Sequence, residues 1–196
     1  MRSEEEMSHP CEPDPVKFIV SLFSAEKELV DRVIEELSGI FGPTDWISKE
    51  CYFDRTRYYE KEMGWPLHRR FVSFEQLIVP ENMVSAKLQT NSIEQRYLRE
   101  GQRRINIDPG YVSPERLVLA TGKNYIHRIY LSKGIYADLT LVFSKGHFEP
   151  LKWTYRDYAD PEVRAYFETV RERYMKQRKE AMERGKEHDR LRQGGA

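Results

Sequence analysis

The stretch VKFIVSLF, residues 16–23, decides how the fold begins. Its run of β-branched and aromatic residues is typical of a buried strand. Apolar residues from Leu29 to Leu37 then recur at helical spacing, until the sequence FGP at 41–43 ends the pattern. A second strand is expected in WISKECYF, residues 46–53. The sequence therefore predicts an N-terminal β-α-β unit.

The segments that follow predict one larger sheet with helices packed against it. We expect a short helix over 55–63, a strand over 66–79 and a helix over 81–99, then a strand that ends in a type II turn at Asp108-Pro109-Gly110. Further strands are expected in LVLATGK (117–123), NYIHRIYL (124–131) and YADLTLVF (136–143), and the Gly-containing turns between them indicate an antiparallel meander. The predicted fold class is α+β, with one mixed or antiparallel sheet.

A C-terminal helix is predicted to begin at Asp160, its N-cap, with Pro161 in its first turn. Its apolar stripe is expected to dock on the core and consists of Val163, Tyr166, Phe167, Val170 and Tyr174. The stripe stops beyond Met175, where residues of both charges take over. This change predicts a solvated or disordered extension, with an RNA-binding or oligomerising arm as the alternative.

Charge is concentrated at the two ends of the chain. The 196 residues are 39% apolar and 33% charged, with a formal net charge of zero. Once the acidic N-terminus and the highly charged C-terminus are set aside, the middle has the composition of an ordinary folded domain. We expect a flexible acidic N-terminus over 1–14, a single α+β domain over 15–175, and a charged extension over 176–196.

Several classes of protein are disfavoured by what the sequence lacks. A net charge of zero provides no global field to steer a nucleic acid. Cys11 and Cys51 are too far apart for a zinc or redox motif, which favours a reduced, cytoplasmic setting. No signal peptide and no run of about 18 apolar residues is present, so we expect a soluble protein. The P-loop fails at Gly122-Lys123, and serine-hydrolase, zincin and Rossmann motifs are also missing.

Three clusters of polar residues stand out against apolar surroundings. They are the helix face Lys87, Thr90, Asn91 and Glu94, the strand face Arg104, Asn106 and Asp108, and the segment Lys123, Tyr125, His127 and Arg128. If the helix packs on these strands, the three clusters converge on one pocket. Arginine and lysine suit phosphate or carboxylate groups, while amides and carboxylates suit hydroxyl or ribose groups. The combination points to an anionic or hydroxylated ligand.

Each residue of this expected pocket has a provisional role. The ligand-binding candidates are Lys87, Asn91, Arg104, Asn106, Lys123 and Arg128. The catalytic candidates are His127, Glu94 and Asp108, because histidine is the side-chain type suited to acid–base chemistry near neutral pH and carboxylates accept protons. No metal ligand is assigned, although magnesium on Glu94, Asp108 and Asp138 is an alternative because hard cations prefer oxygen ligands.

Structural roles compete with these functional ones. Asp108 could bond to its own turn, Glu94 could pair with Arg103 or Arg104, and His127 could be a packed strand residue. Against this, burying several charges without a ligand or strict pairing costs several kcal/mol per ion.

The segments SFEQLI, KLQTNSIE, RRINIDPGYVSPERLVLATGKNYIHRIYL, KGIYADLTL and WTYRDY resemble the bacterial family catalogued as domain of unknown function family 4416. The resemblance covers residues from about Val16 to Phe167 and implies a small cytoplasmic bacterial protein. Members are sometimes labelled GTP-binding proteins, a label that the missing P-loop does not support. The chain departs from the family pattern at Arg156, where the family has proline, which leaves the conformation of that turn open.

Three functions remain as hypotheses. The first is binding of a phosphorylated or nucleotide-like small molecule in the polar pocket, with enzymatic activity left open. The second is an RNA-binding or ribonucleoprotein-associated module that uses core cations, aromatic residues and the tail. The third is a non-catalytic interaction scaffold whose polar clusters are internal salt bridges. The oligomeric state is not indicated by the sequence.

Overall fold

The computed structural model describes residues 9–52 and 57–193, and the side chains of these residues through Arg184. One antiparallel sheet forms its centre, with strand order β2-β4-β1-β5-β6-β8-β7; β3 also pairs with β4, and β9 with β8. The strands are β1 Val16–Ser24, β2 Thr44–Ile47, β3 Cys51–Tyr52, β4 His68–Ile78, β5 Asn106–Val112, β6 Arg116–Thr121, β7 Arg128–Ser132, β8 Ile135–Ser144 and β9 His147–Pro150. The helices are α1 Lys27–Phe41, α2 Glu60–Met63, α3 Met83–Arg96 and α4 Pro161–Gln193, with a 3-10 turn η1 at Pro80–Asn82. The predicted α+β class is confirmed.

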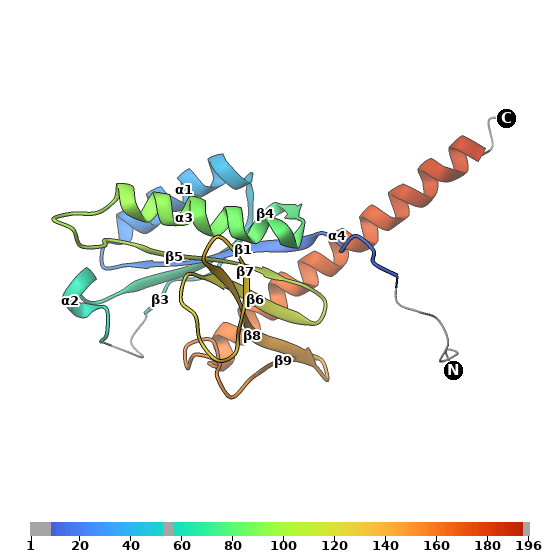
Figure 1. The fold of residues 1–196 in the computed structure, drawn as a ribbon. Coiled ribbons are helices and arrows are strands. Elements are labelled where there is room, and N and C mark those ends of the chain that lie inside the picture. The colour runs from blue at the N-terminus through green and yellow to red at the C-terminus, as the bar shows by residue number, and fades with distance from the viewer. Residues whose placement is uncertain (1–8, 53–56, 194–196) are drawn as a thin grey trace.

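Strand β1 is buried along its whole length because helices cover both faces of the sheet around it. Phe18, Val20 and Leu22 pack with α1 and α3, while Ile19 packs with α4 on the opposite face. Figure 1 shows α1 and α3 together on one side of the sheet and α4 on the other. This three-layer arrangement explains why VKFIVSLF lacks the alternation of a half-exposed strand.

The first half of the sheet consists of two interleaved β-α-β units. Strands β1 and β2 flank α1 in sequence, and β4 lies between them antiparallel to both. In the same way β4 and β5 flank α3, with β1 between them. This split arrangement is the ferredoxin-like topology. The predicted β-α-β unit is therefore present with a strand inserted between its two strands.

The expected turn at Asp108-Pro109-Gly110 is wrong, because these residues lie within β5 and pair with Ser21, Val20 and Ile19 of β1. Glycine is required at 110 by a close approach rather than by a turn. A Cβ there would lie 2.6 Å from the backbone oxygen of Val118 and 2.7 Å from Leu119 Cδ2. The sequence Asp-Pro-Gly, which is typical of turns, therefore lies inside a strand in this protein.

The second half of the sheet is antiparallel throughout, but β6 pairs with β8 rather than with the next strand along the chain. Long strand β8 pairs with β6 on one side and with both β7 and β9 on the other. Lys133-Gly134 and Lys145-Gly146 form two-residue hairpin loops in which every residue has a positive φ, as type I′ turns require. The segment 124–127, expected to be part of a strand, is instead the connection that reaches β7.

Helix α4 begins as expected, with the Asp160 carboxylate accepting the Glu162 N–H at 3.0 Å. All five residues of its predicted stripe contact the core, and Tyr174 is fully buried. The helix continues past Met175 to Gln193 and projects from the sheet in Figure 1. Gln177 still bonds to Lys17 and Glu75 of the core, and the predicted flexible segment 1–14 lies partly outside the described residues.

None of the helices in the described ranges combines the length and apolarity that a bilayer crossing demands.

Candidate functional site

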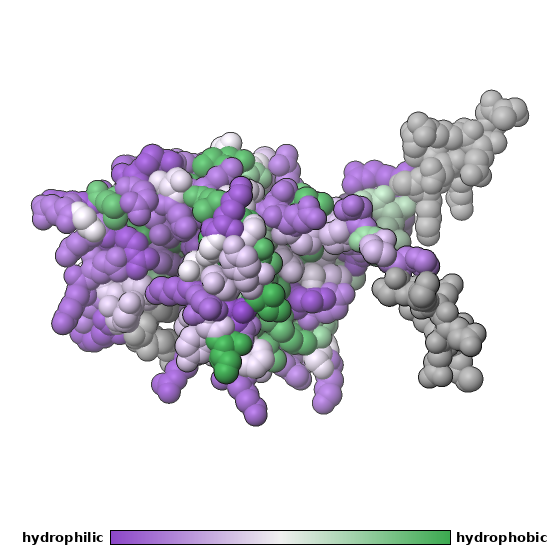
Figure 2. Space-filling view, viewed as in Figure 1, coloured by the Kyte–Doolittle hydropathy of each residue, from purple (hydrophilic) through white to green (hydrophobic). Residues whose placement is uncertain are grey.

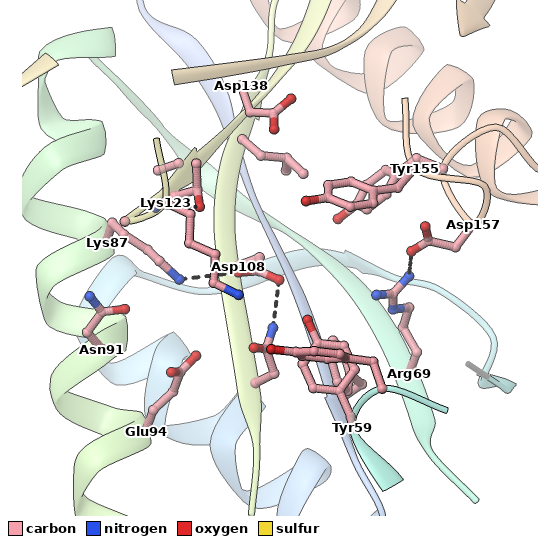
Figure 3. A pocket seen from close by; sticks show the side chains of 18 of the residues that line it. Tyr59, Arg69, Lys87, Asn91, Glu94, Asp108, Lys123, Asp138, Tyr155 and Asp157 are labelled. Atoms are coloured by element: carbon pink, nitrogen blue, oxygen red, sulfur yellow. Dashed lines mark hydrogen bonds and ion pairs between the residues drawn. The ribbon is translucent and has the colours of Figure 1, made fainter. Parts of the chain in front are cut away.

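A cleft of about 720 Å³ opens where β5 and β6 separate. Strand β6 pairs with β5 only over Gly110–Val112, so within the described chain the outer edge of Asn106–Pro109 has no neighbouring strand. The cleft is lined by Phe23, Tyr58, Tyr59, Arg69, Lys87, Asn91, Glu94, Arg103, Asn106, Asp108, Leu119, Ala120, Thr121, Gly122, Lys123, Arg128, Asp138, Tyr155, Arg156, Asp157 and Tyr158. Figure 3 draws 18 of these side chains, which converge from α3, the sheet and the loop before α4.

Helix α3 supplies one wall of the cleft and completes the hydrogen bonding of the open strand edge. Lys87, Asn91 and Glu94 are spaced so that they share one face of the helix. The Ile107 N–H donates to Glu94 Oε1 at 2.6 Å, and Lys87 Nζ donates to the Ile107 carbonyl at 2.8 Å. These two side chains replace the strand that is missing beside Ile107. Pro109, two residues on, has its backbone nitrogen toward the same edge and has no N–H to satisfy there.

A chain of polar contacts crosses the floor of the cleft. The Arg103 guanidinium binds both carboxylate oxygens of Glu62, at 2.6 and 2.8 Å, and donates to Asn106 Oδ1 at 3.0 Å. Asn106 Nδ2 donates to Asp108 Oδ2 at 2.6 Å, and Lys87 Nζ lies 3.2 Å from Asp108 Oδ1. The Arg103 donors hold the pKa of Glu62 below its ordinary value. Asn106 and Asp108 are therefore fixed in orientation before any ligand arrives.

Burial raises the pKa of two acids that line the cleft. Glu94 is almost fully buried, and the loss of hydration raises its pKa above the ordinary 4.5, with the nearby Asp108 charge adding to the effect. Burial likewise raises the pKa of the Tyr59 phenol to about 12, again with a contribution from Asp108. Tyr59 is thus a neutral phenol at physiological pH.

The opposite wall is built around Arg69, which is buried and forms an ion pair with Asp157. Its guanidinium carbon lies 5.0 Å from the centre of the Phe23 ring and 5.7 Å from that of Tyr158. Aromatic faces stabilise a cation by cation–π attraction. Figure 3 shows this pair across the cleft from Lys87, Asn91 and Glu94.

A third group of contacts closes the end of the cleft beside β7 and β8. Arg128 Nε donates to Asp138 Oδ2 at 2.8 Å, and its terminal nitrogens donate to the Lys123 carbonyl and the Tyr155 hydroxyl. Lys123 behaves differently, because its ammonium lies 5.8 Å from the Tyr58 ring centre and has no carboxylate partner among the described residues. In Figure 3 the Lys123 side chain reaches into the middle of the cleft.

The structure brings together seven of the nine site residues expected from the sequence: Lys87, Asn91, Glu94, Asn106, Asp108, Lys123 and Arg128. Arg104 lies elsewhere, paired with Glu26. The alternation 104-106-108 does not hold, because β5 begins only at Asn106 and the preceding residues are not extended in register. Arg103 enters the cleft instead.

His127 lies behind Asp138 rather than on the cleft lining. Its ring stacks on Trp153 with centres 5.2 Å apart, and Nε2 lies 3.4 Å from Asp138 Oδ2. Its side chain is only 7% exposed. In this position the histidine contacts a lining residue but does not face the cleft.

Arg69, Tyr58 and Tyr59 were missed by the sequence reasoning. Arg69 lies at the start of β4, in HRRFVSF, and the available signal was a pair of adjacent arginines leading into an apolar run. The adjacent tyrosines precede a short helix and carry no periodic signal.

Magnesium binding by Glu94, Asp108 and Asp138 has no geometric counterpart, since the described residues contain no group of three or more His, Cys, Asp or Glu placed to hold one ion. The lining carries six cationic and four carboxylate side chains. All four carboxylates already bond to a cation or a backbone N–H. Of the six cations, Arg69, Lys87 and Arg128 pair with lining carboxylates and Arg103 pairs with Glu62, which leaves Lys123 and Arg156 without an ion pair within the described chain.

Comparison with known proteins identifies the family of the chain but gives no activity. No curated protein and no solved structure matches it. The family model "Domain of unknown function (DUF4416)" matches residues 14–174, which include the whole sheet and every residue of the cleft. The chain belongs to this family, the domain of unknown function DUF4416.

Proposed function

We propose that the cleft binds a phosphorylated or similarly anionic small molecule that also carries a flat ring, as a nucleotide does. The observation that carries the proposal is the Lys123 ammonium, which forms no ion pair among the described residues and lies in a lining whose carboxylates are all engaged. An unneutralised cation in a concave site attracts an anion, and this attraction is strengthened where the walls exclude water.

The second part of the proposal, the flat ring, rests on the tyrosines. Tyr58 and Tyr155 are exposed at the cleft, and the half-buried Tyr59 also lines it. Aromatic side chains of this kind stack on planar groups. The volume of about 720 Å³ is in the range of small-molecule sites. Asn91, for which no hydrogen bond is formed in the described chain, offers an amide to a ligand hydroxyl or ring nitrogen.

The experiment is a thermal-shift screen of the full chain, followed by calorimetry, against nucleoside mono-, di- and triphosphates, sugar phosphates and inorganic phosphate. Binding is expected to weaken about tenfold or more in Lys123→Ala, because a charge-assisted hydrogen bond contributes about 1.5–3 kcal/mol. The matched control is Lys176→Ala, an exposed lysine of α4 far from the cleft. If no compound binds, or if Lys123→Ala binds as tightly as the Lys176→Ala control, the proposal is wrong.

A further inference from the structure

Strand β7 presents an apolar edge that the rest of the sheet does not. Tyr125 and Ile126 just before the strand are exposed, as are Ile129, Tyr130 and Leu131 within it; Ile126 is 95% and Ile129 70% accessible. In the described chain β7 pairs only with β8, so its other edge carries unpaired backbone groups. Figure 2 shows green, apolar residues in the region of β7 and β8, bordered by hydrophilic surface.

Two other outer strands, β9 and β2, are protected against pairing. Strand β9, in line with β7 along β8, carries Glu149 and ends at Pro150, two devices that block edge-to-edge contact. Strand β2 at the opposite end of the sheet is short and lies under α4, where Trp46 contacts Tyr166 and Arg173 bonds to the Asp45 carbonyl. Strand β7 has no proline and no charge between Arg128 and Lys133.

We infer that β7 pairs with β7 of a second copy of this chain, so that two sheets join into one across a two-fold axis. An antiparallel pairing centred on Tyr130 places Ile129 opposite Leu131 of the other copy and Arg128 opposite Ser132. No like charges then face each other, and a chain with zero net charge does not repel its copy.

The surface available fits this occupant. The five exposed side chains present roughly 600 Å² together, taking about 200 Å² for each large side chain when fully exposed. A stable interface buries about 800 Å² on each partner. The backbone edge of the strand and a neighbouring apolar groove can supply the remaining area. The groove has a volume of about 360 Å³, and its walls include Met83, Val118 and Leu131. Leu131 lines the groove, and Ile129 pairs with Ala137, which also lines it, so Ile129 lies on the same side; the register of β7 shifts between Tyr130 and Ser132.

Sedimentation equilibrium of the full chain tests the inference. The wild type is expected to dimerise, and Ile129→Lys is expected to weaken the dimer about tenfold or more, because a charge at the centre of an interface is rarely tolerated. Ile40→Lys, at an exposed position on α1, is the matched control and should leave the dimer intact. Both variants should keep the wild-type circular dichroism spectrum, since lysine on an edge strand is compatible with folding.

Crosslinking tests the axis independently. In a Cys11→Ser background, Tyr130→Cys should form a disulfide-linked dimer under mild oxidation, whereas Lys145→Cys at the β8–β9 turn should not. The inference is overturned if the wild type stays monomeric across a 100-fold range of protein concentration. It is also overturned if Ile129→Lys leaves the dimer unchanged, or if the two cysteine variants crosslink equally.

Discussion

Replacing Glu94 tests whether a buried carboxylate completes the open edge of β5. In Glu94→Gln the amide oxygen still accepts the Ile107 N–H, whereas Glu94→Leu leaves this buried donor without a partner. An unsatisfied buried donor costs about 1–3 kcal/mol. For a chain of this size, each kcal/mol lowers the melting temperature by about 2–4 °C. Glu94→Leu should therefore melt several degrees below Glu94→Gln.

The dependence of stability on pH separates the charge of Glu94 from its hydrogen bond. Because burial raises the pKa of Glu94 above 4.5, the folded state binds this proton more tightly than the unfolded chain does. The stability that the protonated group contributes is present below about pH 4.5 and is lost as the pH rises through the raised pKa. Glu94→Gln has no such loss, so its free energy of unfolding should gain on the wild type between pH 4.5 and 8 in urea denaturation.

Glu62→Gln is the control with the opposite sign. The pKa of Glu62 is lowered by Arg103, so the stability that its charge contributes is present above pH 4.5 and is lost as the pH falls through the lowered pKa. Relative to the wild type, the stability of Glu62→Gln should fall as the pH rises toward 4.5 and should stay level from pH 4.5 to 8. A difference in stability between Glu94→Gln and the wild type that stays constant from pH 4.5 to 8, as it should for the Glu62 control, or that shifts in favour of the wild type, would refute the reasoning.

Three further substitutions test packing and ion pairing in and around the sheet, the first two by urea unfolding and the third by thermal melting. Gly110→Ala should destabilise the fold by about 1–3 kcal/mol or more, because its Cβ would lie 2.6 Å from a backbone oxygen of β6. The control Gly39→Ala has open space around the new Cβ in α1 and should stabilise the fold by up to about 1 kcal/mol. Equal effects of the two substitutions would contradict this prediction. Asp45→Ala should cost about 3–5 kcal/mol, since it strips the fully buried Lys17 of its carboxylate, and Lys17→Met in the same chain should recover most of the loss. Arg128→Ala should lower the melting temperature because it removes bonds to a carboxylate, a phenol and a carbonyl; an unchanged melting temperature would count against that network.

Residue spacing was sufficient to predict contacts where all the residues concerned lie on one face of a single helix. Lys87, Asn91 and Glu94 follow the helical repeat, and the structure places all three on the cleft. The apolar stripe of α4 could be predicted equally well, because Phe167 and Val170 recur at the spacing of a helix that packs on a core.

Local sequence patterns gave wrong or no predictions where the role of a residue depends on contacts with distant parts of the chain. Asp108-Pro109-Gly110 has the composition of a turn, yet Gly110 is needed for the approach of β6, and Pro109 is tolerated where no strand pairs with its nitrogen side. The pairing of β6 with β8 depends on a crossing connection that no short window reveals. Arg69 reaches the cleft only because the loop before α4 brings Asp157 to it from 88 residues away.

The hydrogen bond from the Ile107 N–H to Glu94 of α3 makes this one amide a reporter of movement at the cleft. Along most of β1 and β4 an amide exchanges its hydrogen with solvent only when strands part. The Ile107 amide is bonded to the Glu94 side chain instead, so its exchange is governed by movement of one helix away from the sheet. A ligand that bridges Lys87 and the cleft floor would hold that helix down and slow the exchange at this amide, while leaving the exchange of β1 unchanged.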